Sequence, residues 1–275
     1  MKTIGKPFYL GSGLVRPFPI LGTLLALMLL VGLAFQFWQS RQEALNKAEH
    51  ITRTLSELLE QRISGDFERL DALLGFAATE FQPQQLATLP ANDRHQQAKR
   101  LARLMDDFPE IAGAFIFDET GALQLTTLSD VKPFTIADRP HFISLRDNPA
   151  LTTVFSDPQI ARSTGKLAIV QSRAIRDSGT GRFLGIVNAI YHLDALNEEI
   201  SRIDVGPRGV TLLRRTDNFK LVARYPRLNP TDFGQPLPED NPIRQRIAQG
   251  DKAGFLVYNA STDGQTRLGS FRILE

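Results

Sequence analysis

The longest apolar run of the chain lies near its start. Residues 18–38, FPILGTLLALMLLVGLAFQFW, carry no ionisable side chain. A helix of this length crosses a hydrocarbon core of about 30 Å. The run is longer than the core of a signal peptide, and no small-residue cleavage site follows it, so an uncleaved span is favoured over a cleaved signal. The pattern therefore predicts a transmembrane helix over 18–38.

The charges on either side of this run predict its orientation. Lys2, Lys6 and Arg16 precede it with no acidic residue among them, whereas residues of both signs follow it. Because an excess of Lys and Arg marks the cytoplasmic side, we expect residues 1–17 to be cytoplasmic and everything after Trp38 to lie outside.

A regular apolar stripe follows the predicted span. Apolar side chains recur every three or four positions from Ala44 to Phe81, which is the pattern of one helical face. We predict a long helix over 41–82, about 60 Å in length, and expect Pro83 to end it. Its apolar face packs on its own domain or, in the turns nearest the membrane, on a partner chain.

From Ile111 the apolar spacing changes to that of strands. Residues 111–127 predict a hairpin around the turn 118–121, and residues 167–193 predict further strands joined by the turn RDSGTGR. The same layout recurs in 209–226 and 254–274, a displacement of roughly ninety to a hundred residues that is too long for a solenoid repeat.

These patterns predict an α+β fold with two tandem lobes, each an antiparallel sheet with helices packed against it. The lobes would span 83–203 and 204–275, with the linker near 204–207. The second copy ends one strand short of the first, which predicts that the chain is part of a longer protein.

Composition narrows the classes of function. Lys and Arg number 32 against 30 Asp and Glu, spread along the chain, so a nucleic-acid partner is disfavoured. The chain has no cysteine, and its four histidines show no metal-ligand spacing. No serine lies in a G-x-S-x-G turn, and ARSTGK at 161–166 lacks the glycine spacing of a phosphate loop. We predict no enzyme activity in residues 1–275, no cofactor and no metal.

Four segments carry a family resemblance. DRPHF at 138–142 is followed by segments at 156–177, 181–196 and 203–226. In this order and spacing, the chain resembles the double-Cache (PDC-like) extracytoplasmic sensor domains of bacterial transmembrane receptors. It looks most like the sensors that precede diguanylate cyclase (GGDEF) outputs, and its lobes would be PAS-like.

This resemblance implies a location and a mechanism. The chain would sit in the bacterial inner membrane as a homodimer, with its sensor domain in the periplasm. The membrane-distal lobe would bind a small molecule, and the membrane-proximal lobe would relay the change to a cytoplasmic output in cyclic-di-GMP signalling. A sensor of a histidine kinase or chemoreceptor is one alternative, and a ligand-free dimerisation scaffold is another.

The resemblance also implies a ligand pocket in the first lobe. Arginine can hold a carboxylate or phosphate through two parallel hydrogen bonds. For each arginine, an ion pair on the surface is the alternative, and Asp138 could pair with Arg139 or Arg173. Strand alternation places Asn188 on the face of Ile186 and Ile190, where a buried amide needs partners. The predicted ligand-binding residues are Asp138, Arg139, His141, Phe142, Arg162, Ser163, Lys166, Arg173, Asn188 and Tyr191.

One position departs from the family. Amino-acid-binding members carry an aspartate at the end of the strand that here reads GIVNAI, and Ile190 takes its place. An α-amino group would lose its counter-charge there. We therefore expect an anionic or polar metabolite as the ligand.

Overall fold

The computed structural model describes residues 17–227, 233–260 and 263–274. Residues through Ile51 and residues from Thr52 form two structural units, and each is described by itself. The basic residues Lys2, Lys6 and Arg16, on which the predicted orientation depends, lie outside the described residues.

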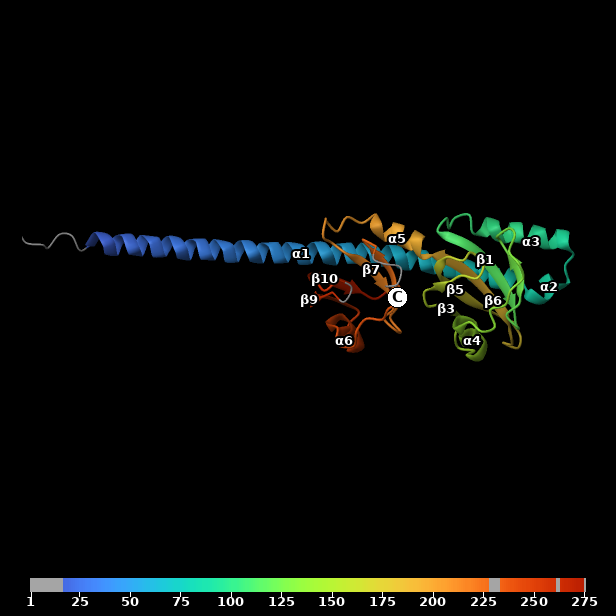
Figure 1. Cartoon of the computed structure of the whole chain (residues 1–275). Coiled ribbons are helices and arrows are strands. Elements are labelled where there is room, and N and C mark those ends of the chain that lie inside the picture. The colour runs from blue at the N-terminus through green and yellow to red at the C-terminus, as the bar shows by residue number, and fades with distance from the viewer. Residues whose placement is uncertain (1–16, 228–232, 261–262, 275) are drawn as a thin grey trace, which may run out of the picture. The chain divides into compact units, whose positions relative to one another are not determined.

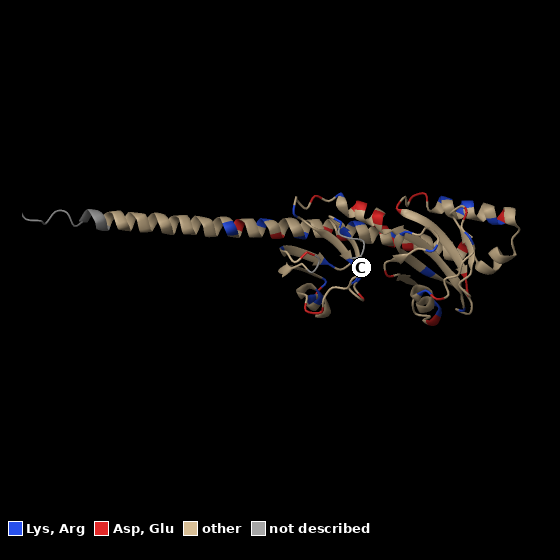
Figure 2. Ribbon diagram, viewed as in Figure 1, with Lys and Arg blue, Asp and Glu red and all other residues tan. Residues whose placement is uncertain are grey.

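The first unit contains the apolar part of α1 (Pro17–Glu80). From Leu21 to Trp38 the described side chains are exposed, and Figure 2 shows no charged residue there. By length and composition this part of α1 could cross a membrane. Such a continuous apolar surface, uncovered by protein, suits contact with lipid.

The second part of α1 packs on the domain that follows. Leu70, Leu74, Ala77 and Phe81 are buried at three- and four-residue spacing, whereas Leu58 is exposed. The predicted stripe is thus covered within the chain in its later turns. The helix ends at Glu80, before Pro83, which begins α2 (Pro83–Thr88) in the position where its missing N–H costs nothing.

A six-stranded antiparallel sheet follows, which we call the large sheet (Figure 1). Its order is β2-β1-β6-β5-β3, and β4 also pairs with β5. The two predicted hairpins are β1–β2 and β5–β6. The strands are β1 (Ile111–Asp118), β2 (Leu123–Thr126), β3 (Thr153–Phe155), β4 (Gln159–Ile160), β5 (Leu167–Arg176) and β6 (Phe183–His192).

Alternation along the strands gives this sheet two buried faces. On one face, Ala189 and Tyr191 of β6 join the core formed with α1, α2, α3 (Ala91–Leu104) and α5 (Leu193–Ser201). On the other, Ile186 and Ile190 join the core that includes α4 (Pro140–Asp147). A sheet covered on both faces reads as nearly continuous apolar strands, as β1 and β6 do here.

The remaining elements form two separate two-stranded ladders within the described residues. The first ladder pairs β7 (Thr211–Arg214) with β8 (Leu221–Tyr225), and the second pairs β9 (Ala253–Asn259) with β10 (Thr266–Arg272). The side chain of Asn241 caps α6 (Pro242–Ala248) by accepting from the Ile243 N–H. We call α2 to α5 the first lobe and β7 to β10 the second lobe. The α+β class is confirmed, and the described residues of the second lobe form these two ladders where the first lobe has the large sheet.

Candidate functional site

A pocket lies on the α4 face of the large sheet. Phe115 and Phe117 of β1 and Asn188 of β6 form its floor, and Arg139 and His141 line it from the start of α4. Gln159 and Ile160 of β4 and the turn 161–163 close another side. The enclosed cavity is small, about 30 Å³, which is room for about two water-sized groups.

The segment DRPHF is placed by the start of α4. Arg139 is the N-cap residue and Pro140 occupies the first helical position, which suits its fixed φ. Phe142 is fully buried and meets Phe183 edge-on, with ring centroids 5.6 Å apart. This anchor holds the helix start against the core, and the preceding residues Arg139 and His141 line the pocket.

Several polar atoms in the pocket are buried without a hydrogen-bond partner. They include both ring nitrogens of His141, Oδ1 of Asn188 and Oγ of Ser163. His141 is only 5% exposed. Leaving such a group unsatisfied costs about 1–3 kcal/mol. A ligand that hydrogen-bonds to these atoms would recover that cost.

The arginines at the pocket have partners within the protein. Arg139 donates to Oε1 of Gln159 at 2.6 Å and to the Ile160 carbonyl at 3.3 Å. Arg162 donates through two nitrogens to the Asp138 carboxylate, at 2.8 and 2.6 Å, and also to the Thr135 carbonyl. Both guanidinium groups therefore stand at the pocket in fixed orientations.

The electrostatics of the site favour negative charge. Burial lowers the pKa of His141 to about 4, with a further contribution from the Arg139 charge. Burial and the neighbouring Arg162 lower the pKa of Arg139. The hydrogen bond from Arg162 holds the pKa of Asp138 below its ordinary value, so this exposed carboxylate is already paired. No carboxylate is among the lining residues that the structure describes.

The structure brings together seven of the ten predicted residues. Arg139, His141, Arg162, Ser163 and Asn188 line the pocket, the exposed Asp138 pairs with Arg162, and Phe142 lies in the same apolar core as the lining phenylalanines. Asn188 shares its face with Ile190, as alternation predicts. Asp138 pairs with Arg162, and not with Arg139 or Arg173, which were the alternatives considered from the sequence.

The other three residues lie elsewhere. Arg173 projects from the opposite face of the sheet and pairs with Asp71 of α1. Tyr191 is buried on that same face, edge-on to Phe67 with ring centroids 5.5 Å apart. Lys166 lies in the exposed turn before β5. Strand geometry explains the first two, because neither residue shares the strand face of Asn188.

The residues predicted from the sequence did not include three that line the pocket, namely Phe115, Phe117 and Gln159. Phe115 and Phe117 could have been found, because they alternate along β1 on the face that meets Asn188. Gln159 has no local signal. Its contact with Arg139 depends on how β4 pairs with β5, between Gln159 and Ala168.

Comparisons with known proteins identify the fold. No family model matches the chain, and neither does any curated protein. Among solved structures, the extracellular domain of a protein described as a histidine kinase, rpHK1S-Z16, is 24% identical with a TM-score of 0.71, covering 82% of this chain and 88% of that one. The chain has the fold of an extracellular sensor domain.

Ligand-binding domains of chemoreceptors share this sensor fold. The domain of CtaA from Pseudomonas fluorescens, in complex with L-isoleucine, is 20% identical with a TM-score of 0.55, covering 82% of this chain and 84% of that one. The domain of PctB from Pseudomonas aeruginosa PAO1, in complex with L-Arg, is 14% identical with a TM-score of 0.55, covering 80% and 85%. The sensor fold that the family resemblance implies is therefore found in both receptor classes.

Proposed function

We propose that this chain is the membrane-anchored, extracytoplasmic sensor of a bacterial receptor. The first lobe would be the membrane-distal, ligand-binding lobe, and the second would relay the change toward the membrane. The sensor fold, the apolar part of α1 and the pocket on the large sheet support this proposal together. A ligand shifts such a receptor only by its difference in affinity between two conformations.

The ligand that suits this pocket is a small carboxylate or another small anion. Arg139 presents a guanidinium group whose acceptors, Gln159 and the Ile160 carbonyl, are neutral, whereas Asp138 balances the charge of Arg162. Ile190 of the lining is apolar, at the position where the family resemblance implies an aspartate that pairs with an α-amino group. The amino acids named for CtaA and PctB are thus a poorer match here than an acid without that amino group.

The observation that carries the proposal is the state of His141. Its imidazole is buried in the pocket, and neither ring nitrogen has a hydrogen-bond partner. A core histidine with only a structural role is normally satisfied by neighbouring groups. A bound carboxylate would accept a hydrogen bond from this ring and would favour its protonated form.

The output and the assembly belong to the same proposal. The sequence favours a diguanylate cyclase, but the structures named above come from a histidine kinase and from chemoreceptors, so these outputs fit about as well. We place the chain in the inner membrane as a homodimer, with its N-terminus cytoplasmic and its sensor in the periplasm. A scaffold that dimerises without a ligand is the competing proposal.

Thermal shift tests the binding function. The full chain in detergent is screened against acetate, pyruvate, lactate, succinate, malate, citrate and phosphate, with L-isoleucine and L-arginine as comparison ligands. At a concentration of 100 times Kd, binding to the folded state alone adds about 2.7 kcal/mol to the free energy of unfolding. We expect an anion to give the largest shift.

Two variants show whether the pocket is responsible. Arg139→Gln should weaken binding by about 10- to 100-fold, because it removes a charged hydrogen-bond donor. Arg146→Gln, on the same helix but paired with Asp147 at the surface, is the matched control and should bind normally. If no compound stabilises the wild-type chain while it dimerises tightly, the scaffold proposal is favoured instead.

A further inference from the structure

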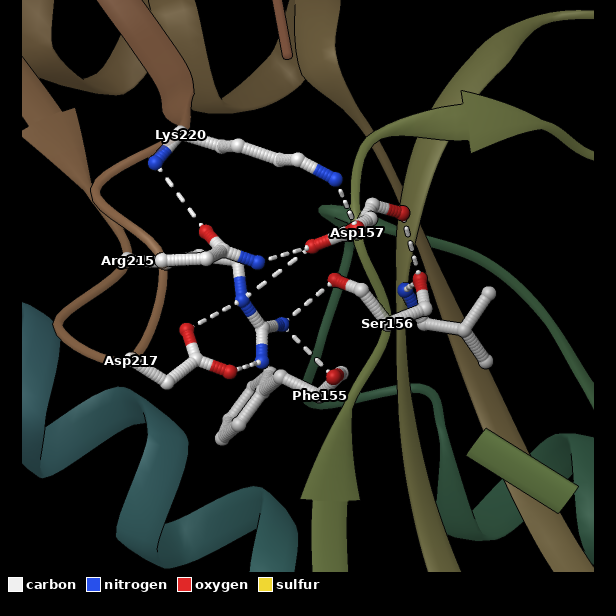
Figure 3. A network of polar contacts seen from close by, with 8 residues as sticks. Phe155, Ser156, Asp157, Arg215, Asp217 and Lys220 are labelled. Atoms are coloured by element: carbon white, nitrogen blue, oxygen red, sulfur yellow. Dashed lines mark hydrogen bonds and ion pairs between the residues drawn. The ribbon is translucent and has the colours of Figure 1, made fainter. Parts of the chain in front are cut away.

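One short segment connects the pocket with the second lobe. Residues 155–161, which we call the coupling segment, run from the end of β3 through β4. Gln159, Ile160 and Ala161 line the pocket at one end. At the other end, Phe155, Ser156 and Asp157 contact the β7–β8 hairpin (Figure 3).

The hairpin holds its end of the segment through the backbone. Arg215 donates from Nη1 to the Phe155 carbonyl at 2.6 Å and to the Ser156 carbonyl at 2.7 Å. Asp217 fixes the same guanidinium with two contacts of 2.8 and 2.5 Å. Arg215 is 18% exposed and its two carbonyl bonds are partly buried, whereas Asp217 is 59% exposed.

Asp157 adds a charged contact between the coupling segment and the hairpin. Its carboxylate accepts from Asn218 at 2.7 Å and pairs with Lys220, and it lies 3.4 Å from Nε of Arg215. Burial alone would raise the pKa of Asp157, but the hydrogen bonds from Lys220 and Asn218 leave it below its ordinary value. Three side chains of one hairpin thus converge on a single carboxylate of the other lobe.

The pocket holds the opposite end through Arg139. That guanidinium donates to the side chain of Gln159 and to the carbonyl of Ile160. A ligand carboxylate that binds Arg139 competes with both acceptors. Occupancy of the pocket would therefore loosen or move the same residues that continue into the contacts with the hairpin.

The chain between the two ends is short and stiff. Only Pro158 separates Asp157 from Gln159, and two extended residues span at most about 7 Å. The proline ring also fixes one backbone dihedral at this point. A movement of the Gln159 backbone should therefore also move Asp157.

A second connection between the lobes runs along the other face of the large sheet. Val222 and Ala223 of β8 share an apolar core with Leu196 and Ile200 of α5. The pocket does not reach this core, because its lining residues lie on the α4 face. Among the contacts between the lobes that the described residues make, the coupling segment begins in the pocket wall.

We propose that the coupling segment transmits the state of the Arg139 side chain to the β7–β8 hairpin through Asp157 and Arg215. Its use by a ligand rests on the proposed sensor function, whereas the coupling itself is a property of the unliganded chain. Coupling between two sites is reciprocal, so a change at either end must alter the other.

Hydrogen exchange on the full chain in detergent tests this link without any ligand. Arg139→Gln should speed exchange at the Arg215 amide, which donates to Lys220 in the hairpin, by about two- to fivefold. Asp157→Asn should speed exchange at the Ala161 amide, which donates to Lys166 beside the pocket, by a similar factor of about two to five. The combined variant should show less than the product of the two effects at each amide.

Two further variants keep the test decisive. Asp147→Asn breaks a surface pair on α4 and should change neither amide. Arg215→Lys retains the charge but loses the fork that joins Asp217 to the two carbonyls. If Asp157→Asn folds poorly, Arg215→Lys takes its place and should have the same effect on the Ala161 amide. The proposal is overturned if each substitution alters exchange only in its own lobe. If the chain binds an anion but the substitutions show no coupling, the coupling proposal fails and the sensor proposal stands. If the substitutions show coupling but no anion binds, the sensor proposal fails and the coupling proposal stands.

Discussion

The two lobes differ in how completely their sheets are covered. The large sheet of the first lobe has helices on both faces, and β6 is buried along eight of its ten residues. In the second lobe, β8 is buried at four of its five residues, but β9 is buried only at Gly254 and no described residue of β10 is buried. Two-stranded ladders are marginal by themselves. The comparison suggests a rigid lobe that holds a pocket and a softer lobe that can respond to it.

The largest expected effect concerns the core of the first lobe. Phe142→Ala removes a fully buried ring at the start of α4 and should lower the free energy of unfolding by about 3–5 kcal/mol. Val257→Ala, at a side chain that is 60% exposed in β9, should change it by about 0.5 kcal/mol or less. Urea denaturation measures both. Similar losses in the two variants would contradict the contrast between the lobes.

The second prediction uses the buried histidine of the pocket. His141 has a pKa of about 4 in the folded chain against 6.5 in the unfolded chain. The unfolded state therefore binds the proton first as the pH falls. The stability contributed by the neutral ring is complete above pH 6.5 and is lost toward pH 4, by about 3 kcal/mol.

Denaturation between pH 7 and pH 4 measures this loss. His141→Gln should remove that part of the pH dependence, whereas His95→Gln, at an exposed position, should retain it. A His141→Gln protein with the same pH dependence as the wild type would show that this ring is not held neutral by burial.

The third prediction separates the two faces of the large sheet. Arg173→Gln breaks the partly buried pair with Asp71 and should cost about 1.5–3 kcal/mol of stability, because the Asp71 carboxylate loses its charged donor. It should leave anion binding unchanged, in contrast to Arg139→Gln. Calorimetric titration with the best-binding anion checks this. Weakened binding in Arg173→Gln would mean that the face toward α1 also takes part.

The smallest effect is expected at Tyr191. Its hydroxyl is buried without a partner, so Tyr191→Phe removes an unsatisfied group and should change stability by about 1 kcal/mol or less, in the stabilising direction. Anion affinity should stay within error. Thermal unfolding and titration check both, and a marked destabilisation would reveal a partner for this hydroxyl.

Local patterns predicted most of the fold. The apolar run, the stripe on α1 and the hairpins of the large sheet follow from spacing alone, because each reports which face of an element is covered. The alternation of side chains along β6 also correctly placed Asn188 on the same face as Ile190. Applied to Tyr191, it would have separated that residue from the pocket, because three positions along a strand reverse the face.

Other features depend on contacts between distant segments. The sequence offers no local sign that Asp138 pairs with Arg162, or that Gln159 meets Arg139. Arg215 reaches the Phe155 carbonyl across 60 positions of the chain. Such contacts are set by strand pairing and by the packing of one lobe on the other, which composition and periodicity do not encode.

The ring of His141 gives the most direct test of an anion-binding pocket. Its pKa can be followed by NMR in the full chain, with and without the anion that gives the largest thermal shift. We predict a rise from about 4 toward neutrality, because a carboxylate beside the ring favours the protonated form. A pKa that stays near 4 while the anion binds would place the binding site elsewhere and contradict the account.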